Sequence, residues 1–356
     1  MNMTGACWMR RTLGEPVSAL LIDSQNSIIA GGWNGRLTKW DASGDEIWTA
    51  QLPDRIGCIA IDEDFVYATA GLHLVAVKSI SGEVQWQRAL EGSADIVEAN
   101  GGFVYAVSSV YDIEHNDFID SAIWCFDISG NQIWETHIAE RPWTLNIHNE
   151  VLYLGLGRPK MGYAKVSEDG ELNHYSLESD SPVTSAVLTG DGVLFGHANG
   201  DLTNLDGHKF SGSGVSIGQI CLTSNHSVIF SDNQQIVQLN EGFSELSRLT
   251  VGTVTALSAG IYVAGKQTLW VGIQDGNSGL LRVISLTDNI DIASMRVGKI
   301  NTIISNGKRV VVGDEFGEVY VWEEDLFNRR VNSEQSEEDD ARRQTMRDRL
   351  NALRTR

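Results

Sequence analysis

The chain has 356 residues, of which 42% are hydrophobic, so it is long enough to bury a large core. Its 27 Lys and Arg residues stand against 47 Asp and Glu residues, and the resulting net charge of −20 disfavours partners with an anionic surface, such as nucleic acids and acidic membranes. Four scattered cysteines without a CxxC pair indicate buried thiols in a reducing compartment. Because the N-terminus lacks the apolar region of a signal peptide and no apolar run reaches membrane-spanning length, we expect a cytoplasmic protein.

One pattern recurs along the chain with a period of about forty residues, the length of a four-stranded propeller blade. Each copy has an apolar strand, a Gly-rich turn, a second strand, an Asp/Ser-Gly turn and a strand that often carries Trp. The clearest copies are residues 19–52, 57–90 and 101–138. The repeat predicts an all-β fold, an eight-bladed β-propeller of four-stranded antiparallel blades over residues 3–327.

Eight inner strands and seven outer strands are readable in chain order. The predicted inner strands begin near Val17, Ile56, Ile96, Trp143, Val183, Ile217, Val254 and Ile300. The predicted outer strands are 47–50, 84–88, 132–137, 172–177, 209–212, 246–251 and 292–297. The eighth outer strand is missing after Trp322, but residues 6–14 resemble the other outer strands. We therefore expect the N-terminal strand to complete the last blade and close the ring.

Tryptophans occupy a recurrent place on the outer strands. Trp8, Trp48, Trp86 and Trp134 each follow a polar or acidic segment near the start of such a strand. Large aromatic side chains at one position of a repeat are typical of packing between repeats. We predict that all four pack between blades.

Two insertions interrupt the regular pattern. Residues 108–120 lengthen the third blade between its second and third strands, and residues 157–162 lengthen the fourth blade more mildly. Loops at this place share one face of a propeller with the connections between blades, and long loops on a repeat scaffold often form its binding face. The candidate partner-binding acids of the first insertion are Asp112, Glu114, Asp117 and Asp120. Their spacing lacks the Gly and distal Glu of a calcium loop, so a solvated acidic loop or a contact for a basic partner is favoured over a metal site.

Aromatic and basic residues on the same face form a second group of candidates. Trp143 begins an inner strand where other blades have Ile or Val, and Trp33 lies in a turn where a small residue suffices. Arg55, Arg141 and Lys299 immediately precede inner strands. Trp and Arg are enriched in binding hot spots, so these residues are predicted to ring a docking surface at the channel mouth. Packing within the blades is an equal alternative for Trp143.

The composition changes after the last blade. Residues 328–356 are highly charged, and Ser336, the acids at 337–340 and the arginines from 342 onward favour a helix over 336–354. Met346, Leu350 and Leu353 form a narrow apolar stripe on this helix. So short a helix is marginal alone in water, so it is expected to dock on the propeller or on another protein. A disordered terminus is the alternative.

Two repeat families share these motifs. The segments WDASGDEIW (40–48) and FDISGNQIW (126–134) resemble the repeat of pyrroloquinoline-quinone-type (quinoprotein alcohol dehydrogenase-like) propellers, whereas segments 30–41, 196–206 and 312–324 resemble WD-repeat blades. The resemblance implies the propeller fold, with the chain as a divergent member. Quinone-dependent dehydrogenases of this kind are exported and hold their cofactor against a disulfide of adjacent cysteines with a calcium ion. This chain has neither adjacent cysteines nor an export signal, so we expect no cofactor.

No catalytic motif is supported by its context. Residues 214–218 match G-x-S-x-G, but a propeller turn lacks the helix that a nucleophile elbow requires. The eight histidines are spread over several blades without ligand spacing, and no catalytic or metal-binding residue is predicted. We therefore predict a non-catalytic, monomeric, intracellular scaffold that binds other proteins through its loop face and C-terminal helix. The alternative is an enzyme, or a propeller that binds a small molecule or metal, with its site in the central channel.

Overall fold

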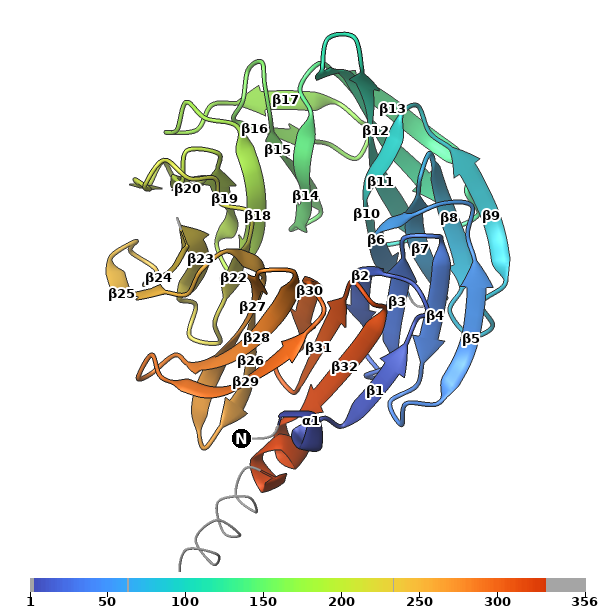
Figure 1. Ribbon diagram of the computed structural model, residues 1–356. Coiled ribbons are helices and arrows are strands. Elements are labelled where there is room, and N and C mark those ends of the chain that lie inside the picture. Colours follow the sequence, from blue (N-terminus) through green and yellow to red (C-terminus); the bar gives the residue numbers. More distant parts are fainter. Residues whose placement is uncertain (1–2, 63, 233, 331–356) are drawn as a thin grey trace, which may run out of the picture.

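The computed structural model describes residues 3–62, 64–232 and 234–330. Eight four-stranded antiparallel sheets follow one another around a ring (Figure 1). The predicted eight-bladed β-propeller is confirmed.

The first four blades run in chain order from the inner to the outer strand. Blade 1 contains β2 (Val17–Ile22), β3 (Ile28–Gly32), β4 (Arg36–Trp40) and β5 (Glu46–Gln51). Blade 2 contains β6 (Ile56–Ile61), β7 (Phe65–Ala70), β8 (His73–Lys78) and β9 (Val84–Ala89). Blade 3 contains β10 (Ser93–Asn100), β11 (Phe103–Asp112), β12 (Asp117–Asp127) and β13 (Gln132–Ile138). Blade 4 contains β14 (Pro142–His148), β15 (Val151–Leu156), β16 (Tyr163–Val166) and β17 (Leu172–Tyr175).

The second half of the ring has the same order up to its last strand. Blade 5 contains β18 (Val183–Thr189), β19 (Gly192–His197), β20 (Leu202–Asn204) and β21 (Lys209–Phe210). Blade 6 contains β22 (Ile220–Leu222), β23 (Val228–Asp232), β24 (Gln235–Leu239) and β25 (Glu245–Thr250). Blade 7 contains β26 (Val254–Val263), β27 (Lys266–Asp275), β28 (Ser278–Ser285) and β29 (Asp291–Val297). Blade 8 contains β30 (Ile300–Ser305), β31 (Arg309–Asp314), β32 (Glu318–Glu323) and β1 (Met9–Thr12).

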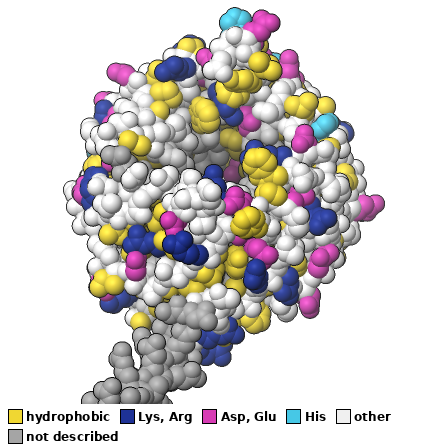
Figure 2. Space-filling view, in the orientation of Figure 1, with side chains coloured by type: hydrophobic (Ala, Val, Ile, Leu, Met, Phe, Trp, Pro, Cys, Tyr) yellow, Lys and Arg dark blue, Asp and Glu magenta, His cyan; other side chains and the backbone are white. Residues whose placement is uncertain are grey.

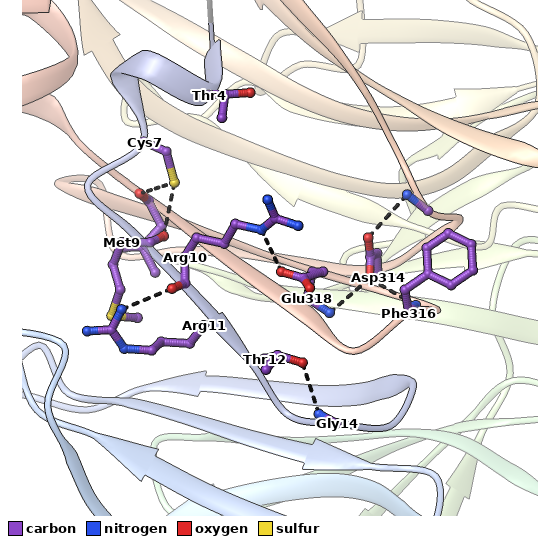
Figure 3. A network of polar contacts seen from close by, with 12 residues as sticks. Thr4, Cys7, Met9, Arg10, Arg11, Thr12, Gly14, Asp314, Phe316 and Glu318 are labelled. Atoms are coloured by element: carbon purple, nitrogen blue, oxygen red, sulfur yellow. Dashed lines mark hydrogen bonds and ion pairs between the residues drawn. The ribbon is translucent and has the colours of Figure 1, made fainter.

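The N-terminal strand closes the ring, as the sequence predicted. β1 pairs antiparallel with β32, from Met9 opposite Val321 to Thr12 opposite Glu318. Arg10 Nε donates to Glu318 Oε2 at 2.6 Å across this seam (Figure 3). A short helix, α1 (Met3–Ala6), precedes β1, and its Met3 carbonyl accepts a hydrogen bond from Trp322 Nε1. Closure therefore combines strand pairing with side-chain burial.

The repeated turn glycines and outer-strand tryptophans form clamps between successive blades. The Trp86 indole donates to the Ile128 carbonyl at 2.8 Å and packs against Gly130, where a Cβ atom would meet the ring at 2.6 Å. Trp48 and Trp134 make the same contacts with the turns of the next blades. Their predicted packing between blades is confirmed.

The prediction for Trp8 is wrong. Met9 occupies the clamp position at the seam, where its sulfur faces Gly44, while Trp8 lies one residue earlier and is 39% exposed. Arg11 supports this register, because its Nε donates to the Gly44 carbonyl as Arg88 Nε donates to the Gly130 carbonyl. The side-chain period of two explains the error, because a shift of one residue turns a side chain to the opposite face of its strand.

A β-bulge near the start of the inner strand recurs in every blade but the sixth. In three blades the bulged residue donates a hydrogen bond to a backbone carbonyl at, or shortly before, the start of the inner strand of the next blade. These contacts run from Ser18 to the Ile56 carbonyl, from Thr184 to the Ile217 carbonyl and from Asn301 to the Val17 carbonyl. A bulge re-aims one side chain, and here it tethers the innermost strands to one another.

The chain is helical over residues 324–330, directly after β32. Phe327 is fully buried beside Trp270 and Trp322, and Asn328 Nδ2 donates to the Tyr262 carbonyl. Phe327 and Asn328 are thus both anchored on blades 7 and 8, although the sequence placed the end of the propeller domain between them. The predicted helix over 336–354, with Met346, Leu350 and Leu353, lies outside the described residues. None of the helices in the described ranges is long and apolar enough to cross a membrane.

Candidate functional site

The candidate site lies on the face formed by the connections between blades and by the turns between second and third strands. On blades 1 and 2, Trp33 lies in the β3–β4 turn and Arg55 precedes β6. The Arg55 guanidinium lies over the Trp33 ring, 4.2 Å from its centroid, and the Trp33 side chain is 48% exposed. The structure thus pairs two predicted residues in a cation–π contact that is open to solvent.

The blade 3 insertion continues β11 and β12 into a hairpin that projects beyond the ring, at the top of the view (Figure 1). Its acids do not converge on one point. Asp112 binds His115 Nδ1 at 2.5 Å at the tip, Asp120 contacts His137 Nδ1 at 3.0 Å, and Glu114 is exposed. A calcium loop, which requires its oxygens around one centre, is not formed by these residues.

Arg141 is the centre of a compact aromatic cluster. Its guanidinium carbon lies 3.7 Å from the Phe118 centroid and 4.1 Å from the Trp143 centroid, and Tyr111 packs edge-on against Phe118. Burial lowers the pKa of Arg141, but the ion pair with Asp95 at 3.3 Å opposes this shift. Because an Arg guanidinium is protonated far above physiological pH, the side chain stays cationic in spite of this lowered pKa. The cluster is therefore an aromatic stack around a guanidinium whose charge is balanced by Asp95.

Trp143 is the bulged residue of β14, at the position from which Ser18 and Thr184 tether their neighbours. Its side chain is 43% exposed. A polar side chain in this position bonds the next blade, whereas Trp143 forms a platform for Arg141 and Phe118. Trp143 thus both packs against Arg141 and Phe118 and leaves part of its ring open to solvent.

A groove of about 600 Å³ opens beside this cluster. The β11–β12 hairpin contributes one wall, and the blade 4 insertion, which contains a cis bond between Arg158 and Pro159, contributes another. The groove is lined by Asp117, Phe118, Arg141, Trp143, Arg158, Pro159, Met161, Pro182, Thr184 and Ala198. The two insertions read from the sequence thus meet at one site. On the face in view in Figure 2, the centre of the ring is hollowed and bordered by hydrophobic and charged side chains.

The remaining predicted residue, Lys299, joins neither cluster. It is exposed before β30, and its backbone N–H donates to Glu315 Oε1 at 2.8 Å. Sequence reasoning did not single out Phe118, Asp95 or Met161, which complete the groove and its Arg anchor. A bulge leaves Ile119 extra between the pairs Val110–Asp120 and Tyr111–Phe118, so alternation along the hairpin alone does not place the Phe118 side chain.

Reactive groups elsewhere have structural environments. The four cysteines are free, and burial raises the pKa of Cys58 to about 11 and those of Cys125 and Cys221 to about 12. His197 is buried between the Ser181 carbonyl and the Thr203 hydroxyl, and burial lowers its pKa. Residues 214–218 are followed by strand β22 instead of a helix, so they form no nucleophile elbow.

The family model of the outer membrane protein assembly factor BamB matches residues 33–209. Over that stretch the chain is similar to the PQQ-like repeats of this family, as its sequence motifs indicated. A search of curated proteins finds no match.

Solved propellers share its fold at low identity. BamB from Moraxella catarrhalis superposes with a TM-score of 0.69 at 14% identity, covering 89% of this chain and 99% of that one. Sqt1 from Saccharomyces cerevisiae gives 0.71 at 12% identity, covering 88% and 97%. The computationally designed protein Ika8 gives 0.69 at 15% identity, covering 88% and 98%. At these identities the likeness establishes the architecture alone.

Proposed function

We propose that this propeller is a non-catalytic, intracellular scaffold that binds another protein through the groove of blades 3–5. The observation that carries the proposal is the exposed Trp143 and its stack with Arg141 and Phe118 at the groove wall. Trp, Tyr and Arg dominate binding hot spots, and Trp in particular buries a large rigid area with little loss of side-chain entropy.

The groove favours an extended segment with both apolar and acidic side chains. Trp143, Pro159, Met161 and Pro182 offer apolar surface, and no ion pair engages Arg158 among the described residues. A bound apolar side chain removes this surface from water, and a bound carboxylate satisfies Arg158. The cation–π pair of Trp33 and Arg55 is a second contact for a partner long enough to cross the ring, and the charged segment 328–356 is a third.

The matching family model supports this assignment, because its description names an assembly factor, which acts through other proteins. The rival function is an enzyme or small-molecule binder with a site in the central channel. A thermal-shift screen with metabolites separates the two, since a ligand that binds only the native state raises the unfolding temperature.

The decisive experiment is photo-crosslinking from position 161 in the groove. Ile80, which is 83% exposed in the turn between β8 and β9, provides the control position. We expect a partner to crosslink at 161 and not at 80, and Trp143→Ala to weaken its binding about 30-fold with an unchanged circular dichroism spectrum. Ile80→Ala should leave affinity unchanged. A partner bound equally well by Trp143→Ala, or crosslinked equally at both positions, contradicts the proposal, as does fractionation of the protein outside the cytoplasm.

A further inference from the structure

A second cluster of polar side chains lies where blades 2 and 3 meet, and its metal-ligand residues are not among those that line the groove. Glu135 and His137 lie two residues apart on β13, so they project from the same side of that strand. Glu91 reaches them from the connection between β9 and β10. One ligand atom of each of the three residues lies within 4.8 Å of the others.

The imidazole of His137 is held in a definite orientation. Asp120 Oδ2 lies 3.0 Å from Nδ1, and Glu135 Oε1 lies 3.1 Å from Nε2. A carboxylate only accepts hydrogen bonds, so Nδ1 of the neutral ring carries the proton and Nε2 presents a lone pair to the Glu135 carboxylate. Two facing lone pairs at this distance repel unless a positive species lies between them.

A proton satisfies this requirement only in part. Even with His137 protonated, three carboxylates face one positive charge. No Lys or Arg forms an ion pair with any of these carboxylates in the described ranges. The cluster therefore retains an excess of negative charge.

We infer that Glu91, Glu135 and His137 bind a divalent transition-metal ion of the Zn²⁺ class, with Asp120 orienting the imidazole from behind. A histidine that donates its second nitrogen to a carboxylate is the usual arrangement at zinc sites. Ligand atoms around tetrahedral Zn²⁺ lie about 3.3 Å apart, close to the 3.1 Å between His137 Nε2 and Glu135 Oε1. His137 is 50% exposed, so water completes the coordination.

The site joins two blades, and this gives it a structural consequence. Glu91 belongs to the connection leaving blade 2, whereas Glu135 and His137 belong to blade 3. A bound ion therefore links the blades and raises their resistance to unfolding by mass action.

The test is calorimetric titration of Zn²⁺ into metal-free full-length protein at pH 7.5. We expect one ion per chain and a higher unfolding temperature. His137→Gln and Glu91→Gln should each weaken binding at least 10-fold, and Asp120→Asn should weaken it about 10-fold. The matched control is His115→Gln, because His115 also pairs with an Asp, at 2.5 Å, and has no further metal-ligand group among the described residues within reach. It should change affinity less than twofold.

Two further measurements distinguish binding at this site from metal binding by thiols or by other carboxylates. The Co²⁺ form should show d–d absorption without a thiolate charge-transfer band, and Ca²⁺ should not compete, because an imidazole ligand disfavours it. Absence of saturable Zn²⁺ binding overturns the inference. Equal affinity in His137→Gln overturns it too, since the ion then belongs to thiols or other carboxylates. Glu91 lies in a connection, so its variant keeps the test valid if a strand substitution impairs folding.

Discussion

Removal of residues 1–14 tests the seam between β1 and β32. The deletion takes Met3, Met9 and Leu13 out of the core, where they are 2%, 5% and 1% exposed. At about 1.5–3 kcal/mol for each buried side chain, the loss is about 5–9 kcal/mol. That is comparable with the entire stability of a typical domain, about 5–15 kcal/mol. The deletion also leaves β32 as an open edge, so we expect a truncated protein that unfolds readily and self-associates.

A milder substitution makes the same reasoning quantitative. Leu13→Ala should lower the free energy of unfolding by about 3 kcal/mol and the unfolding temperature by about 4 °C for a chain of this size. Arg10→Ala is the control on the same strand. The Arg10 side chain is 56% exposed, so its ion pair with Glu318 should contribute less than about 1 kcal/mol to the free energy of unfolding. Urea titration followed by tryptophan fluorescence, with light scattering for association, gives both values. A truncated chain that stays monomeric with an unchanged midpoint would refute the role assigned to the seam.

Three further outcomes follow from the blades themselves. Gly130→Ala should destabilise the protein by about 2 kcal/mol, because Gly130 has φ +77° and no room for a Cβ atom against Trp86. The control Gly102→Ala should cost about 1 kcal/mol, because Gly102 has φ +84° but lies in open space. Equal losses of stability in urea titration would contradict the contact between Trp86 and Gly130. Burial raises the pKa of Glu98 to about 7, so the ionised Glu98 carboxylate destabilises the folded protein increasingly as the pH rises from about 4.5 to 7. Glu98→Gln should therefore stabilise the protein by up to about 3 kcal/mol at pH 8 and leave its stability unchanged at pH 4. Added pyrroloquinoline quinone should leave the unfolding temperature unchanged, and a saturable rise would argue for a quinone site.

The repeat made the architecture predictable, because each blade repeats the same hydrophobic alternation and turn glycine. All eight inner strands begin within three residues of the predicted positions, and the closing strand was identified from its likeness to the others. Trp8 shows where the reasoning fails. Likeness of composition aligned Trp8 with Trp48, whereas pairing with β32 places Met9 there, and only the backbone register decides between adjacent residues.

The site was predictable only in outline. Insertions and unusual aromatics indicated the face on which the groove and the Trp33–Arg55 contact lie, but not which of the residues contact one another. The stacking of Arg141 between Phe118 and Trp143 depends on the path of the projecting hairpin, which local sequence does not specify. The cluster around His137 was missed for a related reason, because Glu91 is far from it in sequence and meets it only through the packing of two blades.

The seam also imposes an order in time. Arg10 and Glu318 are 308 residues apart, yet they belong to neighbouring strands of one sheet. At about 5–20 residues per second, a ribosome needs about 15–60 s to make the stretch between them. During that interval β1 has no partner strand and must stay free of competing edges. The cost in loop entropy is small, because it grows only with the logarithm of the loop length. Synthesis thus separates the assembly of the early blades from the closure of the ring.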